Sequence, residues 1–599
     1  MVKTDYTYVW DLDSLFEGGS NSAGFANHLA ETKQQISLFQ TKVQQWNPGN
    51  LDNDRRHLLE ILASFEKTAK KLRQAGAFVG CLQAQNTADL HAQQLEAELS
   101  AFRADFQTAL SAFDQLLTLI ENTAWEQLLS SPELAELSFV LSERRELAKE
   151  KLSKKEEAII NALGVDGYHS WGQMYDLIVG KITIPFTDNG KEKPLSVGQA
   201  FNQFSSPDRV VRQTVFKDWE KKWAEQSDYL AKTLNHLAGF RLKVYELRGW
   251  KDVLHEPLRI SRMKKQTLDT MWQVISENKQ PLIEYLNRKA KLLGIEKLSW
   301  FDLDAPLGKA DTKISYQQGA EFILKQFSQF GGKLAAFAEK AFRENWIEAE
   351  DRPGKAPGGF CTYFPESGQS RIFMTYSGTP SNVSTLAHEL GHGYHSYAMQ
   401  GVHYLNRNYA MNVAETASTF AEMIVSDAAV KVAQNEEEKL ALLDDKIQRT
   451  VALLMNIHAR FLFETRFYEE RKQGIVSAQR LNELMLAAEK EAYGDALEEY
   501  HPLFWASKLH FFLTDVPFYN FPYTFGYLFS LGIYAKALKA GKEYEDNYIA
   551  LLKDTASMTV EDLAAKHLDA DLTGKDFWEK AVGLCLEDID EFLRLTADK

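Results

Sequence analysis

The stretch STLAHELGHGYHSYAM, residues 384–399, is the part of the chain from which its fold can be worked out. Its apolar residues are spaced as in a helix, and it contains His388, Glu389 and His392, an H-E-x-x-H motif. Residues four apart lie on one helix face, so both imidazoles can converge on one metal ion. Glu389, rotated by about 100° from the first histidine, can reach a water molecule at that ion. The segment therefore predicts a metal site with a base beside it.

A catalytic zinc site needs a third protein ligand, for which Glu415 is our candidate. It lies in NVAETASTFAE, residues 412–422, a helical segment that can pack back against the first. Glu422 follows two turns later on the same face. His395 is an alternative ligand, but it stands about 10 Å along the axis from the first histidine. We therefore expect His395 to be structural or supporting. The expected ligands of one zinc ion per chain are His388, His392 and Glu415.

The alternative for this cluster is a metal-free helix with hydrogen-bonded histidines. That interpretation leaves Gly391 and Gly393 unexplained, since glycines weaken a helix, and it gives the downstream Glu pair no purpose. The sequence does not settle which metal is bound, because cobalt or manganese also suits a His/His/Glu site.

The composition is that of an ordinary folded protein, with 599 residues, 45% of them hydrophobic. The formal net charge is -15, so a nucleic-acid partner is not expected, because such binding depends on Lys and Arg that neutralise phosphates. The opening MVKTDYTYVWDLDSLF lacks the apolar core of a secretory signal. No stretch approaches the roughly 20 apolar residues that span a bilayer. Cys81, Cys361 and Cys585 fit a reducing compartment. We expect a cytoplasmic protein with no membrane partner.

Changes in composition and in the spacing of apolar residues indicate the domain organisation. Residues 22–163 have apolar residues at three- and four-residue intervals and predict amphipathic helices. Around residues 180–194, a β-branched run, a Pro and an Asn-Gly step predict a short hairpin or extended connection. We place the domain boundary there, between an N-terminal helical domain, 1–185, and a second domain, 186–599. Residues 276–278 and Pro281 predict a kink or break in a later helix.

A Gly- and Pro-rich stretch, residues 351–382, comes directly before the motif helix. It contains two β-like runs, 360–364 and 371–376, which predict a small sheet. One strand edge can run beside the metal and pair with an extended peptide. A purely structural hairpin is the alternative.

With these residues in view, the sequence resembles the thimet oligopeptidase family of zinc metallopeptidases, specifically its oligoendopeptidase F branch, with neurolysin a more distant relative. The similarity includes the opening WDLDSLF, SPDRVVRQ, GGFCTYF, HELGHGYH and AETASTFAE. It implies a mainly α, two-lobed metallopeptidase fold with a deep central channel and a small β-sheet beside the zinc helix. Residues 186–599 would be the catalytic domain, and the substrates short, unstructured peptides. The implied roles are zinc ligand for His388, His392 and Glu415, general base for Glu389, and orientation of a ligand histidine for Glu422.

The run LHFFLTDVPFYNFPYTFGYLFS, residues 509–530, looks like the family segment whose His and Tyr side chains donate hydrogen bonds to the tetrahedral intermediate. The candidates are His510, Tyr519 and Tyr523, with Tyr527 a fourth because GYLFS resembles a run in the thimet branch. Ordinary packing is the alternative for each of them, since Tyr commonly buries its ring.

The predicted function is a zinc-dependent endopeptidase that cleaves internal bonds of short oligopeptides. One alternative is an exopeptidase, of carboxypeptidase or dipeptidase type, that anchors a peptide terminus on Arg371 or Arg407. The other is a catalytically inactive peptide-binding scaffold. Cleavage-site preference, natural substrates, oligomeric state and hinge position stay open.

Overall fold

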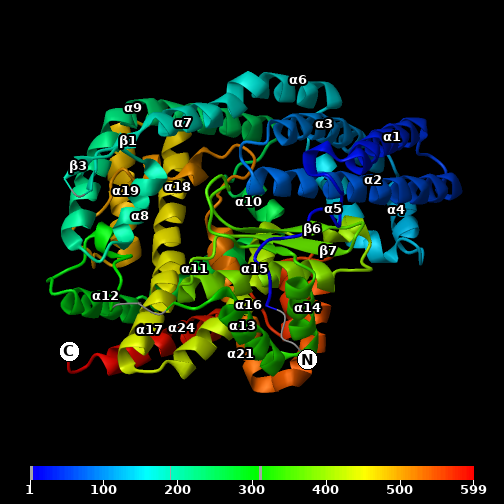
Figure 1. Ribbon diagram of the computed structural model, residues 1–599. Helices are drawn as coiled ribbons and strands as arrows, with labels where there is room; N and C mark the ends of the chain where they lie inside the picture. The colour runs from blue at the N-terminus through cyan, green and yellow to red at the C-terminus, as the bar shows by residue number, and fades with distance from the viewer. Residues whose placement is uncertain (1–4, 189, 309–312) are drawn as a thin grey trace.

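The computed structural model describes residues 5–188, 190–308 and 313–599 and is built almost entirely of helices (Figure 1). The expected mainly α fold class is confirmed. The helices up to residue 247 are α1 (Ala23–Gln45), α2 (Leu51–Gln85), α3 (Leu90–Thr118), α4 (Asn122–Leu129), α5 (Ser138–Lys149), α6 (Lys154–Gly164), α7 (Ser170–Lys181), α8 (Val197–Asn202) and α9 (Arg209–Leu247).

Helices α1 to α5 form an N-terminal lobe with its own hydrophobic core. The helices start where the sequence supplies caps: Ser22, Asn50 and Asp89 each accept a hydrogen bond from the backbone N–H three residues later. This core also takes in Phe364 and Phe373, which belong to a later sheet. The lobe therefore packs directly on the part of the chain that precedes the motif helix.

The predicted hairpin connection is present. β1 (Thr183–Ile184) pairs antiparallel with β4 (Leu195–Ser196), and β2 (Thr187–Asp188) pairs with β3 (Lys191–Glu192). The second, larger hydrophobic core starts at Tyr175, before this hairpin. The domain boundary at residue 185 stays a prediction.

The remaining helices follow the hairpin, and the motif helix α15 is one of them. The predicted break near Pro281 is confirmed, because α11 ends at Glu277 and Pro281 lies in the first turn of the next helix. These helices are α10 (His255–Ile260), α11 (Lys265–Glu277), α12 (Gln280–Leu292), α13 (Tyr316–Phe330), α14 (Gly332–Arg343), α15 (Pro380–Ala398), α16 (Met411–Val432), α17 (Glu436–Val451), α18 (Ile457–Arg471), α19 (Ala478–Tyr493), α20 (Phe504–Ser507), α21 (Phe521–Ala540), α22 (Glu545–Asp554), α23 (Val560–Leu568) and α24 (Asp576–Leu595).

A three-stranded sheet with the order β5-β7-β6 stands between the N-terminal lobe and α15. β6 (Phe360–Phe364) has the predicted bounds, but β7 is Gln369–Phe373 and not 371–376. The antiparallel register explains the difference, because Phe360 pairs with Phe373 and the ladder ends there. The sequence also gave no sign of β5 (Ile347–Glu348), which is only two residues long.

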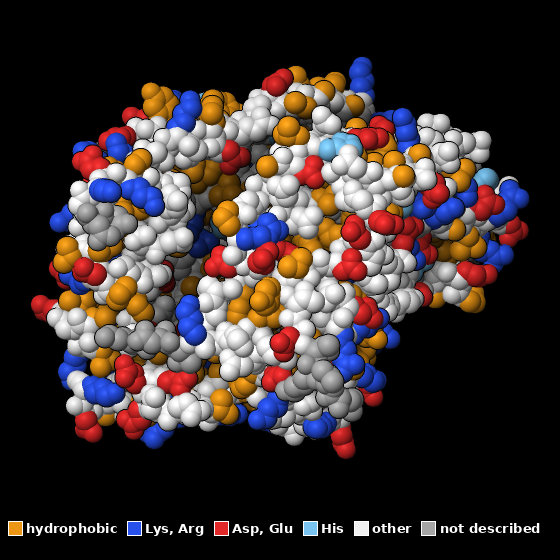
Figure 2. Space-filling view, viewed as in Figure 1, with side chains coloured by type: hydrophobic (Ala, Val, Ile, Leu, Met, Phe, Trp, Pro, Cys, Tyr) orange, Lys and Arg blue, Asp and Glu red, His pale blue; other side chains and the backbone are white. Residues whose placement is uncertain are grey.

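One face of the molecule is hollowed between the helices α7, α9 and α18 and the part that carries α10 and the sheet (Figures 1 and 2). Lys or Arg side chains are visible in the depth of this hollow. Within the described ranges, none of the helices combines the length and the apolar character that crossing a bilayer requires. The three cysteines are free.

Candidate metal centre

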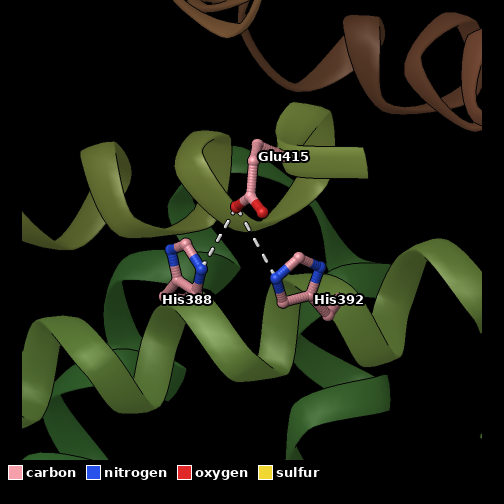
Figure 3. Close-up of side chains that lie close together, drawn as sticks. All are labelled: His388, His392 and Glu415. Atoms are coloured by element: carbon pink, nitrogen blue, oxygen red, sulfur yellow. Dashed lines mark ion pairs between the residues drawn. The ribbon is translucent and has the colours of Figure 1, made fainter. Parts of the chain in front are cut away.

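The motif helix α15 starts with a well-formed cap. The Thr379 side chain accepts from the N–H of Asn382, whose side chain bonds back to the N–H of Thr379, and Pro380 occupies the first helical position. Helical spacing then places His388 and His392 one turn apart on the face toward α16 (Figure 3). The chemistry-bearing residues thus stand on a rigid element.

Gly391 explains how α16 approaches this helix so closely. A Cβ at Gly391 would lie 2.6 Å from Ser418 Cα and nearer still to Ala417 O, so only glycine allows the two backbones to touch there. Gly393 is also packed, since a Cβ would lie 2.9 Å from the Phe337 ring. The crossing sets Glu415, one turn before Ser418, opposite the two histidines.

His388, His392 and Glu415 form the one group of metal-capable side chains found among the described residues (Figure 3). Their potential ligand atoms all lie within 4.8 Å of one another. Glu415 Oε2 lies 3.3 Å from His388 Nε2 and 3.6 Å from His392 Nε2. The structure therefore brings together the three residues that the sequence proposed as ligands.

A second layer of polar contacts orients these side chains. Glu422 Oε2 lies 3.1 Å from His388 Nδ1, and the other oxygen of Glu422 is ion-paired with Arg449. Ser418 Oγ donates to Glu415 Oε2 over 2.8 Å. The sequence indicated Glu422 but not Arg449, because nothing local links α17 to the motif. Ser418 could have been found, since it stands three residues after Glu415 on the same helix.

Burial and neighbouring charges shift the pKa values of the side chains in this site. Burial would lower the pKa of His388, but hydrogen bonds to Glu415 and Glu422 raise it to about 10. Burial lowers the pKa of His392 to about 4. For Glu415, burial opposes ionisation, yet the hydrogen bond from His388 and the charge of His392 bring its pKa to about 2. Glu415 is thus held as a carboxylate with a protonated His388 as its partner, and a metal ion binds His388 only when this proton leaves.

Glu389 is buried, and it lies outside the metal-capable group although it follows His388 directly. Its Oε2 has no hydrogen-bond partner among the described residues. Burial raises its pKa to about 7; the His388 charge opposes this rise, while Glu415 and Glu422 add to it. A carboxyl group that titrates near neutrality can both take up and release a proton at physiological pH.

His395 lies outside the metal group. Its ring is buried and stacks on Tyr409 at 4.2 Å, and its Nε2 is 3.0 Å from Thr555 Oγ1. These contacts agree with the structural role expected from its distance along the helix.

Three of the four aromatic candidates form one cluster. His510 stacks on Tyr519 with ring centres 5.2 Å apart, and Tyr523 lies 5.1 Å from Tyr519 and 6.0 Å from His510. Burial and the charges of Arg460 and Lys508 lower the pKa of His510 to about 4, so it is neutral at physiological pH. The pKa of Tyr523 is raised by burial, by its hydrogen bond with Tyr519 and by the charge of Glu415. Its hydroxyl therefore keeps the proton that it would donate.

Tyr527 does not join this cluster. Its ring is buried in the helical core, and its hydroxyl lies 2.9 Å from Thr450 Oγ1 and 3.5 Å from Cys585 Sγ. The reason is its place in α21: Tyr523 lies in the first turn and is partly exposed, whereas Tyr527 lies one turn deeper and is buried. This geometry favours the packing alternative for Tyr527 over the donation of a hydrogen bond to the tetrahedral intermediate.

The two arginines considered as anchors for a peptide terminus are already engaged. Arg371 is buried and donates to Asp11 O over 2.7 Å and to Ser14 Oγ over 3.1 Å. Arg407 donates to Ser396 O over 2.9 Å, and its guanidinium lies over the Tyr363 ring at 4.6 Å.

Comparisons with known proteins identify the family of this chain. Residues 203–584 match the model of peptidase family M3, and residues 94–184 match the Oligopeptidase F model. The chain belongs to peptidase family M3. This membership confirms the resemblance to the oligoendopeptidase F branch and the predicted enzyme class, so the chain is a metalloendopeptidase.

The M3 relatives match along nearly the whole chain. Chromosomal oligoendopeptidase F of Lactococcus lactis subsp. cremoris is 24% identical over 98% of this chain and 97% of its own length. Oligopeptidase PepF of Bacillus subtilis is 24% identical over 91% of this chain and 82% of its own. Among solved structures, oligoendopeptidase F of Enterococcus faecium has a TM-score of 0.71 at 19% identity, covering 96% of this chain and 99% of that one. PZ peptidase A with an inhibitor has a TM-score of 0.72 at 16% identity, covering 94% of this chain and 97% of that one. Because their sequence identities are this low, the two structures are evidence for the fold of this chain alone.

Proposed function

We propose that this M3 peptidase is a zinc-dependent endopeptidase that cleaves internal bonds of short oligopeptides. The observation that carries the proposal is the convergence of His388, His392 and Glu415 beside Glu389, whose buried oxygen Oε2 has no partner among the described residues. A group of ligands next to a base that is not itself a ligand is the arrangement that catalytic zinc sites use.

The residues present fit one zinc ion. Two imidazole nitrogens and one carboxylate oxygen are a common catalytic ligand set, and the Glu422 contact with His388 Nδ1 is the arrangement that fixes a ligand histidine. When bound, zinc supplies Lewis-acid chemistry: it lowers the pKa of a water molecule and polarises the scissile carbonyl.

Glu389 moves the proton in this mechanism. It accepts a proton from the water that attacks the scissile carbonyl, and it returns the proton to the amine that leaves when the C–N bond breaks. Burial, the largest cause of its raised pKa, supports its role as base, because a buried carboxylate accepts a proton more readily than an exposed one.

The aromatic cluster supplies hydrogen-bond donors for the developing negative charge. We assign this role to His510, Tyr519 and Tyr523, which lie together beside the first turn of α21. A donor held in place before the reaction stabilises the oxyanion without reorganisation. The influence of the Glu415 charge on Tyr523 supports a position near the metal ligands.

The edge of β6 is our candidate for holding the peptide backbone. Gly359, just before this strand, is so close to the base that a Cβ there would lie 3.5 Å from Glu389 Oε1. An extended peptide that adds a strand to this edge would therefore bring its backbone to Glu389. This favours unstructured peptides as substrates over folded proteins.

The two alternatives are less well supported. An exopeptidase needs a free charged anchor, and both Arg371 and Arg407 are engaged in structural contacts. An inactive scaffold would have no use for Glu389, whose burial without a partner costs stability. We also propose a cytoplasmic location, on the evidence of the three free cysteines.

The test is cleavage of an internally quenched short peptide blocked at both ends, with mass spectrometry of the products. We expect internal cleavage that a chelator abolishes and zinc restores. Failure of the folded, zinc-loaded protein to cleave the blocked peptide, with cleavage of the same peptide once a terminus is free, would establish an exopeptidase instead. Failure on both would establish a binding protein.

A further inference from the structure

A pocket of about 480 Å³ opens beside β6. Its walls are α2, α3 and the strand residues Phe360, Cys361 and Thr362, while β7, although fully described, contributes no residue. Since β7 pairs with one edge of β6, and the described residues form no ladder on the other edge, the pocket lies at the free edge. This is the edge that the proposed function assigns to the peptide backbone.

The pocket is within reach of a peptide bond held at Glu389. The free edge of β6 begins at Gly359, next to the base. A strand rises about 3.3 Å per residue, so the pocket-lining residues of β6 lie within about 10 Å of Gly359 along the strand. Side chains of an added strand alternate between the two faces of the sheet. A side chain within about three residues of the cleaved bond is therefore within reach of this pocket when it points to the side of the sheet that α2 covers.

The lining of the pocket indicates which side chains it accepts. Small residues on one face of α2, among them Gly76 and Gly80, create the space, and Leu72 and Phe106 add apolar walls. Arg73 and Arg103 also line it, but both are engaged: the Arg73 guanidinium donates to Thr362 Oγ1 over 3.1 Å, and Arg103 is ion-paired with Glu96. Burial of apolar area is thus the main gain available to an occupant.

We propose that this pocket is a specificity subsite that selects a large apolar or aromatic side chain of the peptide substrate. The inference rests on the proposed endopeptidase function and deepens it. It assigns the N-terminal lobe, through α2, a direct part in choosing where a peptide is cut.

Gly80 offers a way to fill the pocket without disturbing the site. It lines the pocket, and a Cβ there would meet no atom of the described residues within 4 Å. We would compare Gly80→Ala and Gly80→Leu with the wild type on doubly blocked quenched peptides that carry Phe or Ala at each position near the cleaved bond. In the wild type we expect Phe to be preferred at one position. In Gly80→Leu the ratio of kcat/KM for the Phe peptide to kcat/KM for the Ala peptide should fall about tenfold or more.

Gly583→Leu is the matched control, because Gly583 is also a helical glycine with open space at its Cβ, but it stands on α24 outside the pocket lining. Its Phe preference should equal that of the wild type. If Gly80→Leu does not fold, Gly80→Ala must show a smaller loss of the same preference. A folded Gly80→Leu with unchanged preference, or a wild type that prefers Phe nowhere, overturns the subsite while leaving the endopeptidase in place. A zinc-loaded wild type that cleaves none of the peptides overturns the function and the subsite together.

Discussion

The helix pair α15 and α16 and the segment 509–523 are assigned to one site but are held in different ways. In the helix pair, helical spacing sets the positions: His388 and His392 are one turn apart, and Gly391 lets Glu415 come up opposite them. Local geometry alone therefore fixes most of the metal centre.

The segment 509–523 depends instead on distant side chains. Its regular structure is one 3-10 turn, Leu509–Phe512, and the start of α21. Between them, Arg241 on α9 donates to Leu513 O over 3.1 Å. Glu464 on α18 accepts a hydrogen bond from Asn520 Nδ2 over 2.6 Å. Two residues earlier, Phe518 has a φ of +53°, which is rare for a bulky residue.

This difference separates two kinds of mutational effect. Changes to the ligands or their supports should alter metal content, and activity should fall with it. Changes in the segment 509–523 should leave the metal in place and slow turnover. Glu389 tests the comparison most severely, because it lies in the helix pair and yet is assigned a role in turnover alone.

Glu389→Gln should give the largest loss. Without the base, kcat is expected to fall by about 10²–10⁴-fold, while zinc per chain stays at the wild-type value because Gln removes no ligand. Metal analysis and the blocked-peptide assay measure the two quantities. Glu483→Gln, on the exposed side of α19, is the control and should match the wild type in both. Near-full activity in Glu389→Gln would end its assignment as the base.

Tyr523→Phe should lower kcat/KM by about 10²–10³-fold with zinc retained, because it removes a single donor to the oxyanion. Tyr527→Phe is the matched control on the same helix. Its hydroxyl faces Thr450 and Cys585, so its effect on kcat/KM should stay within about threefold, in keeping with a role in packing. An inverted result, with Tyr527 the more sensitive residue, would show that the donor is wrongly assigned.

Glu422→Gln should weaken zinc binding by about 10–100-fold. Gln can still contact His388 Nδ1, but it loses the charge that pairs with Arg449 and supports the ligand. Competition with a chelator of known affinity measures the change, and activity at saturating zinc should largely recover. Unchanged affinity would leave Glu422 a purely structural residue.

The comparison also explains how much the sequence could predict. His388, Glu389 and His392 could be placed from spacing alone, because they sit on one helix whose period is known, whereas Glu415 required the further expectation that its helix packs back on the first. The break before Pro281 and the strand β6 followed from equally local signals. Two features could not be predicted in this way. The packing of Tyr527 depends on α17 and α24, and the two-residue strand β5 exists only through its pairing with β7.

The smallest expected effect concerns the support of the segment 509–523. Burial raises the pKa of Glu464 to about 8, against the charge of Arg241 and the hydrogen bonds from Phe518 and Asn520. In an unfolded chain the pKa of Glu is about 4.3. Between these values the native chain holds a proton that the unfolded chain has lost, so stability declines as pH rises through this window.

Glu464→Gln keeps an oxygen for Asn520 but cannot ionise, so it should remove this part of the decline. We expect its Tm to exceed that of the wild type by about 2 °C at pH 8 and to show no such gain near pH 5. Thermal melts of the zinc-loaded proteins across this range measure the difference, with Glu483→Gln as the exposed control. Parallel Tm curves for the three proteins would mean that Glu464 is ionised in the native chain. The loop would then be held by a buried charge paired through Arg241, and Glu464→Gln should lower kcat/KM by displacing Tyr519 and Tyr523.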